Sequence, residues 1–237
     1  MASVTMSSDG RVTRATLMSQ VEDAVRWDIV SGELAPRQRL RAAELIQKYG
    51  VSATPLREAL QRLAAQKLIN WDPRLGAAVA DVSVGELKDI YWLREVLEVL
   101  ALTRSIERAD DAWDTKLDEA WVGFIKAKRP VAGEDRQGLM AWSRSHRNYH
   151  EALISGCDSE WLMRFNEMLS DHSERYRVHS ARVGTKDGRE AHESIYLAAK
   201  ARDVEEAVAA LRKHLDSTVK AIERQLSSPN EAELATS

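Results

Sequence analysis

The segment VSATPLREALQRL, residues 51–63, is the most informative part of this sequence for the fold of the first half of the chain. Its apolar residues recur at steps of three and four, which predicts a helix with one buried face. These residues are Leu56, Ala59, Leu60 and Leu63. Ser52 or Thr54 can cap the start of the helix, and Pro55 is tolerated in its first turn. On its own, this pattern fits an ordinary amphipathic helix as well as one that enters a DNA groove.

The segments on either side of this helix complete a known arrangement. Residues 17–29 place apolar side chains at four-residue steps and predict a first helix, which Gly32 can end. A short second helix is expected over residues 42–48. Residues 68–71 and 77–80 predict two short strands joined by a hairpin. Three helices followed by a hairpin wing is the order of a winged helix-turn-helix domain, which we expect over residues 15–80.

The remaining sequence is helical almost throughout. Ser83 and Glu86 have the spacing of a capping box, and a long helix is predicted from there to about residue 109. Further helices are expected near residues 112–128, 138–155, 159–182, 188–201 and 203–225. We therefore predict a mainly α protein in which residues 83–225 form an antiparallel all-helical bundle. Residues 1–14 are expected to be a flexible leader and residues 226–237 a disordered tail.

Composition excludes several classes of protein. Apolar residues make up 44% of the chain and charged residues 30%, as in soluble globular proteins. No apolar run approaches the roughly 20 residues of a membrane span, and the lone Cys157 suits a reducing compartment, so a cytoplasmic location is expected. Residues 1–80 hold 11 Lys and Arg against 8 Asp and Glu, or +3, and residues 81–237 hold 23 against 29, or −6. This asymmetry favours a DNA-binding module joined to a domain that does not bind DNA.

Several motifs together resemble the GntR family of bacterial transcription regulators. They are GELAP at residues 32–36, VSATPLREALQRL at 51–63, KLI at 67–69 and LG at 75–76. The resemblance implies that Ser52, Thr54 and Arg57 contact the phosphates or bases of DNA. It also implies that Gly76 lets the wing approach the minor groove.

Three positions depart from the family pattern. Ala53 and Leu75 stand where the family usually has arginines, and Lys67 replaces a glycine. Because arginine is the commonest reader of guanine, Arg57 becomes the main candidate for base recognition in this helix. Arg74, one residue before the usual wing arginine, is a candidate substitute for it.

All six histidines follow residue 140. His146 and His150 stand at i and i+4, which places both imidazoles on one helix face, close enough to share a metal ion. His192 and His214 fall on two later helices, and a helical bundle can bring all three helices around one point. The alternative is that these are surface histidines or hydrogen-bonded core histidines.

Residues 84–222 resemble the FCD effector domain that follows many GntR-type DNA-binding domains. The resemblance is carried by YHEAL at residues 149–153, AH at 191–192, ARD at 201–203 and KHL at 213–215. It implies that His150, His192 and His214 are metal ligands, with His146 in place of the family's usual Asp or Asn. A set of four imidazoles favours a divalent transition metal, zinc first, with nickel or copper as alternatives.

In that family the metal holds a carboxylate effector, and arginines in the cavity pair with the acid. Arg94, in LREVLE at residues 93–98, matches a family motif and is the first candidate for such a contact. Tyr176 and Arg177 are further effector-binding candidates. For the arginines, a surface or structural salt bridge remains an equal alternative.

These features predict a metabolite-responsive regulator rather than an enzyme. We expect a homodimer that binds a palindromic operator in double-stranded DNA and acts as a repressor released by a small carboxylic acid. Arg147 follows His146 where a zinc protease would have its catalytic glutamate, which disfavours a hydrolase. The alternatives are a regulator whose metal is purely structural and a helical metal-dependent hydrolase fused to a DNA-binding domain.

Overall fold

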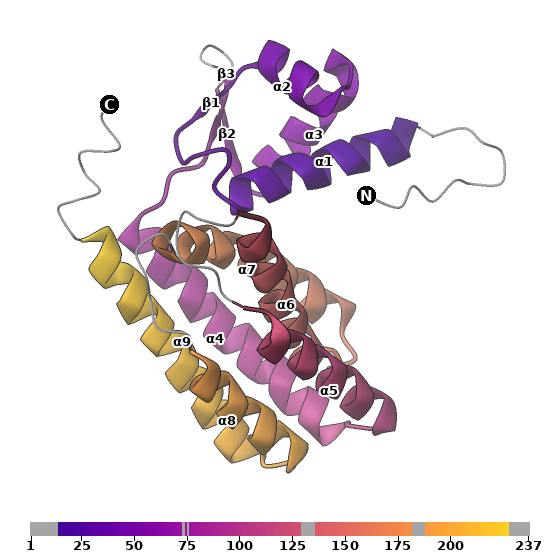
Figure 1. The fold of residues 1–237 in the computed structure, drawn as a ribbon, viewed down its shortest axis with the longest axis vertical. Helices are drawn as coiled ribbons and strands as arrows, with labels where there is room; N and C mark the ends of the chain where they lie inside the picture. Colours follow the sequence, from indigo (N-terminus) through magenta and orange to yellow (C-terminus); the bar gives the residue numbers. More distant parts are fainter. Residues whose placement is uncertain (1–13, 73, 75, 129–135, 182–187, 228–237) are drawn as a thin grey trace. The chain divides into compact units, whose positions relative to one another are not determined.

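The computed structural model describes residues 14–72, 74, 76–128, 136–181 and 188–227. The chain divides into two compact units, Met1–Asp81 and Val82–Ser237, which are described separately. The fold is mainly α with one small antiparallel sheet, which confirms the predicted fold class (Figure 1). The expected leader and tail fall largely outside the described residues, as does the wing position Leu75.

The first unit contains three helices and a three-stranded sheet. Its elements are α1 (Arg14–Val30), β1 (Arg39–Leu40), α2 (Ala42–Tyr49), α3 (Ala53–Ala65), β2 (Ile69–Asp72) and β3 (Gly76–Val79). The hairpin pairs Ile69 with Val79 and Asp72 with Gly76, and β1 adds to the other side of β3. Strand β1 was not predicted, because two residues are too few to show a period.

Left-handed backbone ends two of these elements. Gly50 has φ +64° after α2, and its N–H donates to the carbonyl of Ile46. Lys67, which replaces the glycine of the GntR pattern, has φ +63° just after α3. A side chain in this conformation costs about 1–2 kcal/mol relative to ordinary helical backbone. The backbone therefore explains why glycine suits this position and why lysine is strained there.

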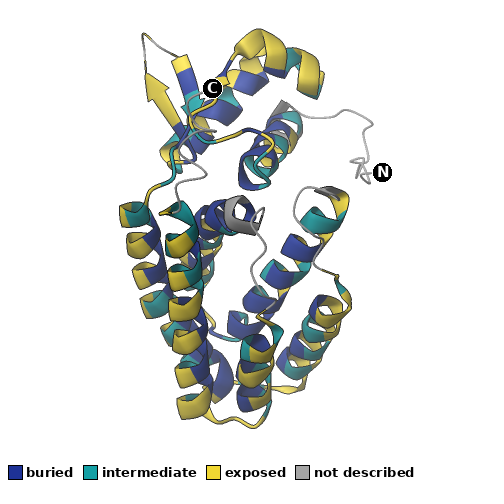
Figure 2. Cartoon of the chain, turned by 60° about the vertical axis from the view of Figure 1, so that its left-hand side comes forward, coloured by how far each residue is buried: buried dark blue, intermediate teal, exposed yellow. Residues whose placement is uncertain are grey.

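The second unit is a bundle of six helices within the part of the chain that the structure describes. They are α4 (Val84–Glu107), α5 (Asp111–Lys126), α6 (Arg136–Ile154), α7 (Glu160–Ala181), α8 (Arg189–Lys200) and α9 (Val204–Leu226). α4 packs along α7 and α9, α8 packs on α9, and α5 packs on α6. The helices turn their buried faces inward and their exposed faces outward (Figure 2). None of the described helices combines the length and apolar character that a membrane span requires.

The predicted capping box at the start of α4 is formed only in part. The Ser83 hydroxyl accepts a hydrogen bond from the Glu86 N–H at 3.1 Å, as expected. The reciprocal bond passes through Tyr176 of α7: the Ser83 N–H donates to the Tyr176 hydroxyl at 3.1 Å, and that hydroxyl donates to the Glu86 carboxylate. Tyr176 therefore joins the start of α4 to α7.

Candidate DNA-reading helix and histidine cluster

Helix α3 has the two faces that a DNA-reading helix needs. Its back is buried in the core of the first unit, where Leu56 and Leu63 are almost inaccessible to solvent. Ser52, Thr54 and Arg57 are exposed on the front. Ser52 occupies the N-cap position, but its side chain makes no capping hydrogen bond. The Arg57 side chain forms no hydrogen bond or ion pair with any residue that the structure describes.

The two candidate wing residues lie at the β2–β3 turn. Arg74 is exposed, and its backbone N–H donates to the Asp72 carboxylate at 2.7 Å. Gly76 is exposed with φ +82°, and a Cβ placed there would meet no atom within 4 Å. The need for glycine at this position therefore comes from the backbone conformation rather than from lack of space.

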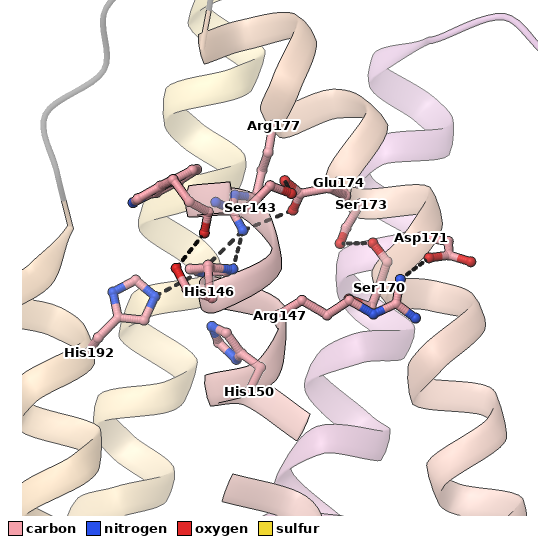
Figure 3. Close-up of polar contacts among 12 residues, drawn as sticks. Ser143, His146, Arg147, His150, Ser170, Asp171, Ser173, Glu174, Arg177 and His192 are labelled. Atoms are coloured by element: carbon pink, nitrogen blue, oxygen red, sulfur yellow. Dashed lines mark hydrogen bonds and ion pairs between the residues drawn. The ribbon is translucent and has the colours of Figure 1, made fainter. Parts of the chain in front are cut away.

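The structure brings four histidines together from three helices of the second unit. His146 and His150 come from α6, His192 from α8 and His214 from α9, and all four are buried. One ring nitrogen from each lies within 4.8 Å of the others. Figure 3 shows the rings of His146 and His192 meeting, with His150 one turn further along α6. The i, i+4 spacing on α6 thus does place two imidazoles at one point.

Hydrogen bonds orient individual rings in this cluster. The Nδ1 of His192 lies 2.7 Å from the carbonyl of Gly188, so it is the donor and its Nε2 carries a lone pair. That Nε2 is 2.9 Å from the Nε2 of His146. The Nε2 of His150 is buried with no hydrogen-bond partner among the described residues. Unpartnered buried polar atoms are rare, so this nitrogen is a candidate ligand atom.

Burial keeps these histidines neutral. It lowers the pKa of His146, His192 and His214 well below 6.5, and the neighbouring charges act in the same direction. Burial also lowers the pKa of His150, although Glu98 opposes the shift. A neutral imidazole has one free lone pair, which is the form that binds a metal ion.

Glu98 is a part of this site that the sequence analysis did not identify. Its carboxylate lies 3.7 Å from the Nδ1 of His150. The Arg94 guanidinium donates to the same carboxylate at 2.5 Å and to the Ser173 hydroxyl at 3.1 Å. Burial opposes ionisation of Glu98, but Arg94 and His150 together lower its pKa to about 2. The signal was present in the i, i+4 spacing of Arg94 and Glu98, which typifies an intrahelical ion pair.

The three effector candidates have different surroundings. Arg177 extends to the cluster, with its Nη1 3.1 Å from the Nε2 of His146 and 3.0 Å from the Glu174 carboxylate. Arg94 is buried and forms an ion pair with Glu98, as expected if this arginine has a structural role. Tyr176 uses its hydroxyl at the start of α4. Arg177 is therefore the candidate nearest to the histidine cluster.

A cavity of about 200 Å³ adjoins the cluster between α4, α6 and α7. Arg94, Glu98 and His150 form part of its wall, together with Asn166 and Ser170 of α7. The Asn166 side-chain oxygen is buried and has no hydrogen-bond partner within the described ranges. The cavity is smaller than the roughly 300–1,000 Å³ typical of sites for drug-sized ligands. Ile154 and Met163 add apolar side chains to the wall, so the cavity suits a small ligand with both polar and apolar parts.

Comparison with known families gives matches over both units. Residues 17–79 match the family described as bacterial regulatory proteins, gntR family, and residues 89–217 match the FCD domain. The chain is 30% identical over 213 residues to the HTH-type transcriptional repressor GlaR of Escherichia coli strain K12, covering 86% of this chain and 96% of the relative. It is also 30% identical over 210 residues to the regulator BphR of Paraburkholderia xenovorans, covering 87% and 85% of the two chains.

Comparison with solved structures supports the same fold. The structure of McbR/YncC from E. coli aligns with a TM-score of 0.76 and 23% sequence identity. The alignment covers 92% of this chain and 100% of that one. At this level of identity the match concerns the fold alone.

Proposed function

This chain belongs to the GntR family of bacterial regulatory proteins and carries an FCD domain, and on that premise we propose that it is a repressor released by a small carboxylic acid. Like these relatives, the chain is a DNA-binding transcription regulator, and it is not an enzyme. The observation that carries the proposal is the buried cluster of four histidines, which lies beside a cavity and is contacted by Arg177.

We assign operator binding to the first unit. The exposed residues at the front of α3 and at the wing would contact double-stranded DNA, with Arg57 as the main base reader. The remaining proposed contacts are Ser52, Thr54, Arg74 and Gly76. A homodimer would present two such surfaces to the two halves of a palindrome.

The histidine cluster fits a divalent transition metal by the chemistry of its donors. Four neutral imidazoles are suitable ligands for zinc, and secondarily for nickel. The orphaned Nε2 of His150 and the lone pair on the Nε2 of His192 are the atoms that a cation would satisfy. His146 and His214 would complete the set. When bound, such a metal supplies positive charge to an anionic ligand.

Residues of this chain would position the acid. Arg177 places a cation beside His146, and Arg94 contributes a second guanidinium to the cavity wall. Charged hydrogen bonds from guanidinium to carboxylate are among the strongest in proteins. Asn166 offers an unpartnered polar atom for a second polar group of the ligand. Tyr176 is proposed as an effector contact only because it lies next to Arg177 on α7.

The proposal is tested by metal content and by thermal shift. We expect close to one transition metal per wild-type chain and a large loss of metal in His192→Ala. His172→Ala is the matched control, because His172 is a buried histidine of α7 outside the four-histidine set and should leave metal content unchanged. Small mono- and dicarboxylic acids at 100 times Kd would stabilise the protein by about 2.7 kcal/mol, which corresponds to several degrees in Tm.

The outcomes separate the proposal from its alternative. A site that holds the acid predicts that chelation abolishes the acid-dependent shift in Tm while leaving operator binding in place. A purely structural metal predicts that chelation melts the second unit with or without acid. Equal metal content in wild type and His192→Ala would refute the four-histidine site.

A further inference from the structure

Glu98 of α4 is a carboxylate buried beside the histidine cluster, and it is outside the set of four histidines. Arg94 and His150 lower the pKa of Glu98 to about 2, so the side chain is ionised. An ionised carboxylate has no proton to donate and only accepts hydrogen bonds. A buried charge is costly unless it is paired, so the partners of this carboxylate indicate its role.

Arg94 fixes one oxygen of this carboxylate. The Nε of Arg94 donates to the Oε1 of Glu98 at 2.5 Å. The same guanidinium is itself held on α7, because its Nη1 donates to the Ser173 hydroxyl at 3.1 Å. That hydroxyl in turn donates to the carbonyl of Ser170 at 2.9 Å. Glu98 is therefore anchored from α7, and its second oxygen is left for a different partner.

The two ring nitrogens of His150 have different surroundings. The Nδ1 lies 3.7 Å from the Oε2 of Glu98, whereas the Nε2 is buried with no hydrogen-bond partner among the residues whose positions are described. A neutral imidazole carries one proton, on either nitrogen. A proton on Nδ1 faces the negative carboxylate, whereas a proton on Nε2 would leave a lone pair facing that charge. The surroundings therefore favour the proton on Nδ1 and a lone pair on Nε2.

His192 is oriented by a different kind of acceptor. Its Nδ1 lies 2.7 Å from the carbonyl of Gly188, which is a neutral group on its own helix. Hydrogen bonds to an ionised acceptor are roughly twice as strong as those between neutral groups. A carboxylate behind a histidine ring also makes the opposite nitrogen a more basic metal ligand. Of these two rings, His150 therefore has the surroundings that strengthen a ligand more.

We propose that Glu98 is a positioning residue for the histidine cluster, whose carboxylate accepts a hydrogen bond from the Nδ1 of His150 and thereby fixes the ring with its Nε2 free to bind a metal ion. The separation of 3.7 Å is a few tenths of an ångström longer than a hydrogen bond, and a small rotation of the ring closes it. This inference rests on the metal site of the proposed function and adds a residue outside its four ligands. Arg94 acts on the cluster only through Glu98.

The first test is the affinity of the chelator-treated full chain for zinc. Glu98→Gln keeps the size of the side chain and removes its charge, so its Kd for zinc should be about 10–100 times that of wild type. Asp171→Asn is the matched control, because Asp171 is another buried carboxylate of the second unit and pairs with Arg147. It should lose stability and keep the wild-type Kd. A merely structural role for Glu98 predicts that both variants keep that Kd.

A second variant keeps the proposal open to refutation if Glu98→Gln disturbs folding. Glu98→Gln leaves Arg94 buried without its charged partner, which is destabilising. The double variant Arg94→Met with Glu98→Leu removes both charges, and apolar side chains of similar volume often replace a buried ion pair without loss of stability. Circular dichroism should show that this variant is folded, and its Kd for zinc should again be about 10–100 times that of wild type.

The tautomer of His150 gives a readout that needs no metal. Long-range ¹H–¹⁵N NMR spectra of the metal-free wild type should place the proton of His150 on Nδ1, and His150→Asn identifies the signals of this ring. A proton on Nε2 would overturn the proposal. Unchanged zinc affinity in both Glu98 variants would also overturn it, while the four-histidine site of the proposed function would stand. A wild type that binds no zinc would overturn both.

Discussion

Lowering the pH should destabilise the metal-free second unit. Burial holds the pKa of His146, His192 and His214 well below 6.5, so these rings stay neutral in the folded unit. In the unfolded chain they become protonated at about pH 6.5. The unfolded state therefore binds more protons, and stability falls as the pH drops through 6.5.

The size of the effect follows from the number of buried rings. Between pH 7.5 and 5.5, each ring that protonates only in the unfolded state costs about 1.4 kcal/mol, so the three together cost about 4 kcal/mol. This is a large part of the 5–15 kcal/mol of a typical folded protein. Glu98, with its pKa lowered to about 2, changes protonation in the unfolded state only at more acidic pH and stays outside this window.

The assay is urea unfolding of chelator-treated protein at the two pH values, followed by tryptophan fluorescence. Five of the seven tryptophans, Trp92, Trp113, Trp121, Trp142 and Trp161, belong to the second unit and report on it. His146→Asn removes one ring and should reduce the pH effect by about 1.4 kcal/mol. The same unfolding free energy at pH 7.5 and 5.5 would show that these histidines are not held neutral in the folded unit.

Three further predictions concern individual side chains. Arg57→Ala should weaken specific operator binding at least tenfold in a gel-shift assay and leave the thermal unfolding midpoint unchanged, since the side chain lies outside the core; wild-type affinity would contradict its assignment. Lys67→Gly should raise the free energy of unfolding by up to about 1 kcal/mol in urea, because glycine relieves the left-handed backbone at little cost; a loss of stability would contradict this. Tyr176→Phe should cost about 1–2 kcal/mol by the same measurement, because the Ser83 N–H loses its partner; an unchanged value would show that water replaces the hydroxyl.

The sequence determined the helices and their order because their signals are local. Apolar spacing located α3 to within two residues of its observed ends, and the i, i+4 spacing of His146 and His150 placed them on one face of α6. The strand β1 escaped prediction because it depends on pairing with β3, which is distant in sequence. The Ser83 cap was predicted, but its completion by Tyr176 joins residues 93 positions apart.

The histidine set shows the same division between local and distant information. Sequence spacing indicated only that a helical bundle can bring four of the six histidines together. The resemblance to the FCD domain was needed to predict that these four are metal ligands. Only the tertiary structure brought α6, α8 and α9 to one point and supplied Glu98 and Asn166, which carry no signature of their own. Sequence patterns report which face of a helix is buried. The packing of helices distant in sequence decides which buried groups meet, because it depends on the shape of all their side chains at once.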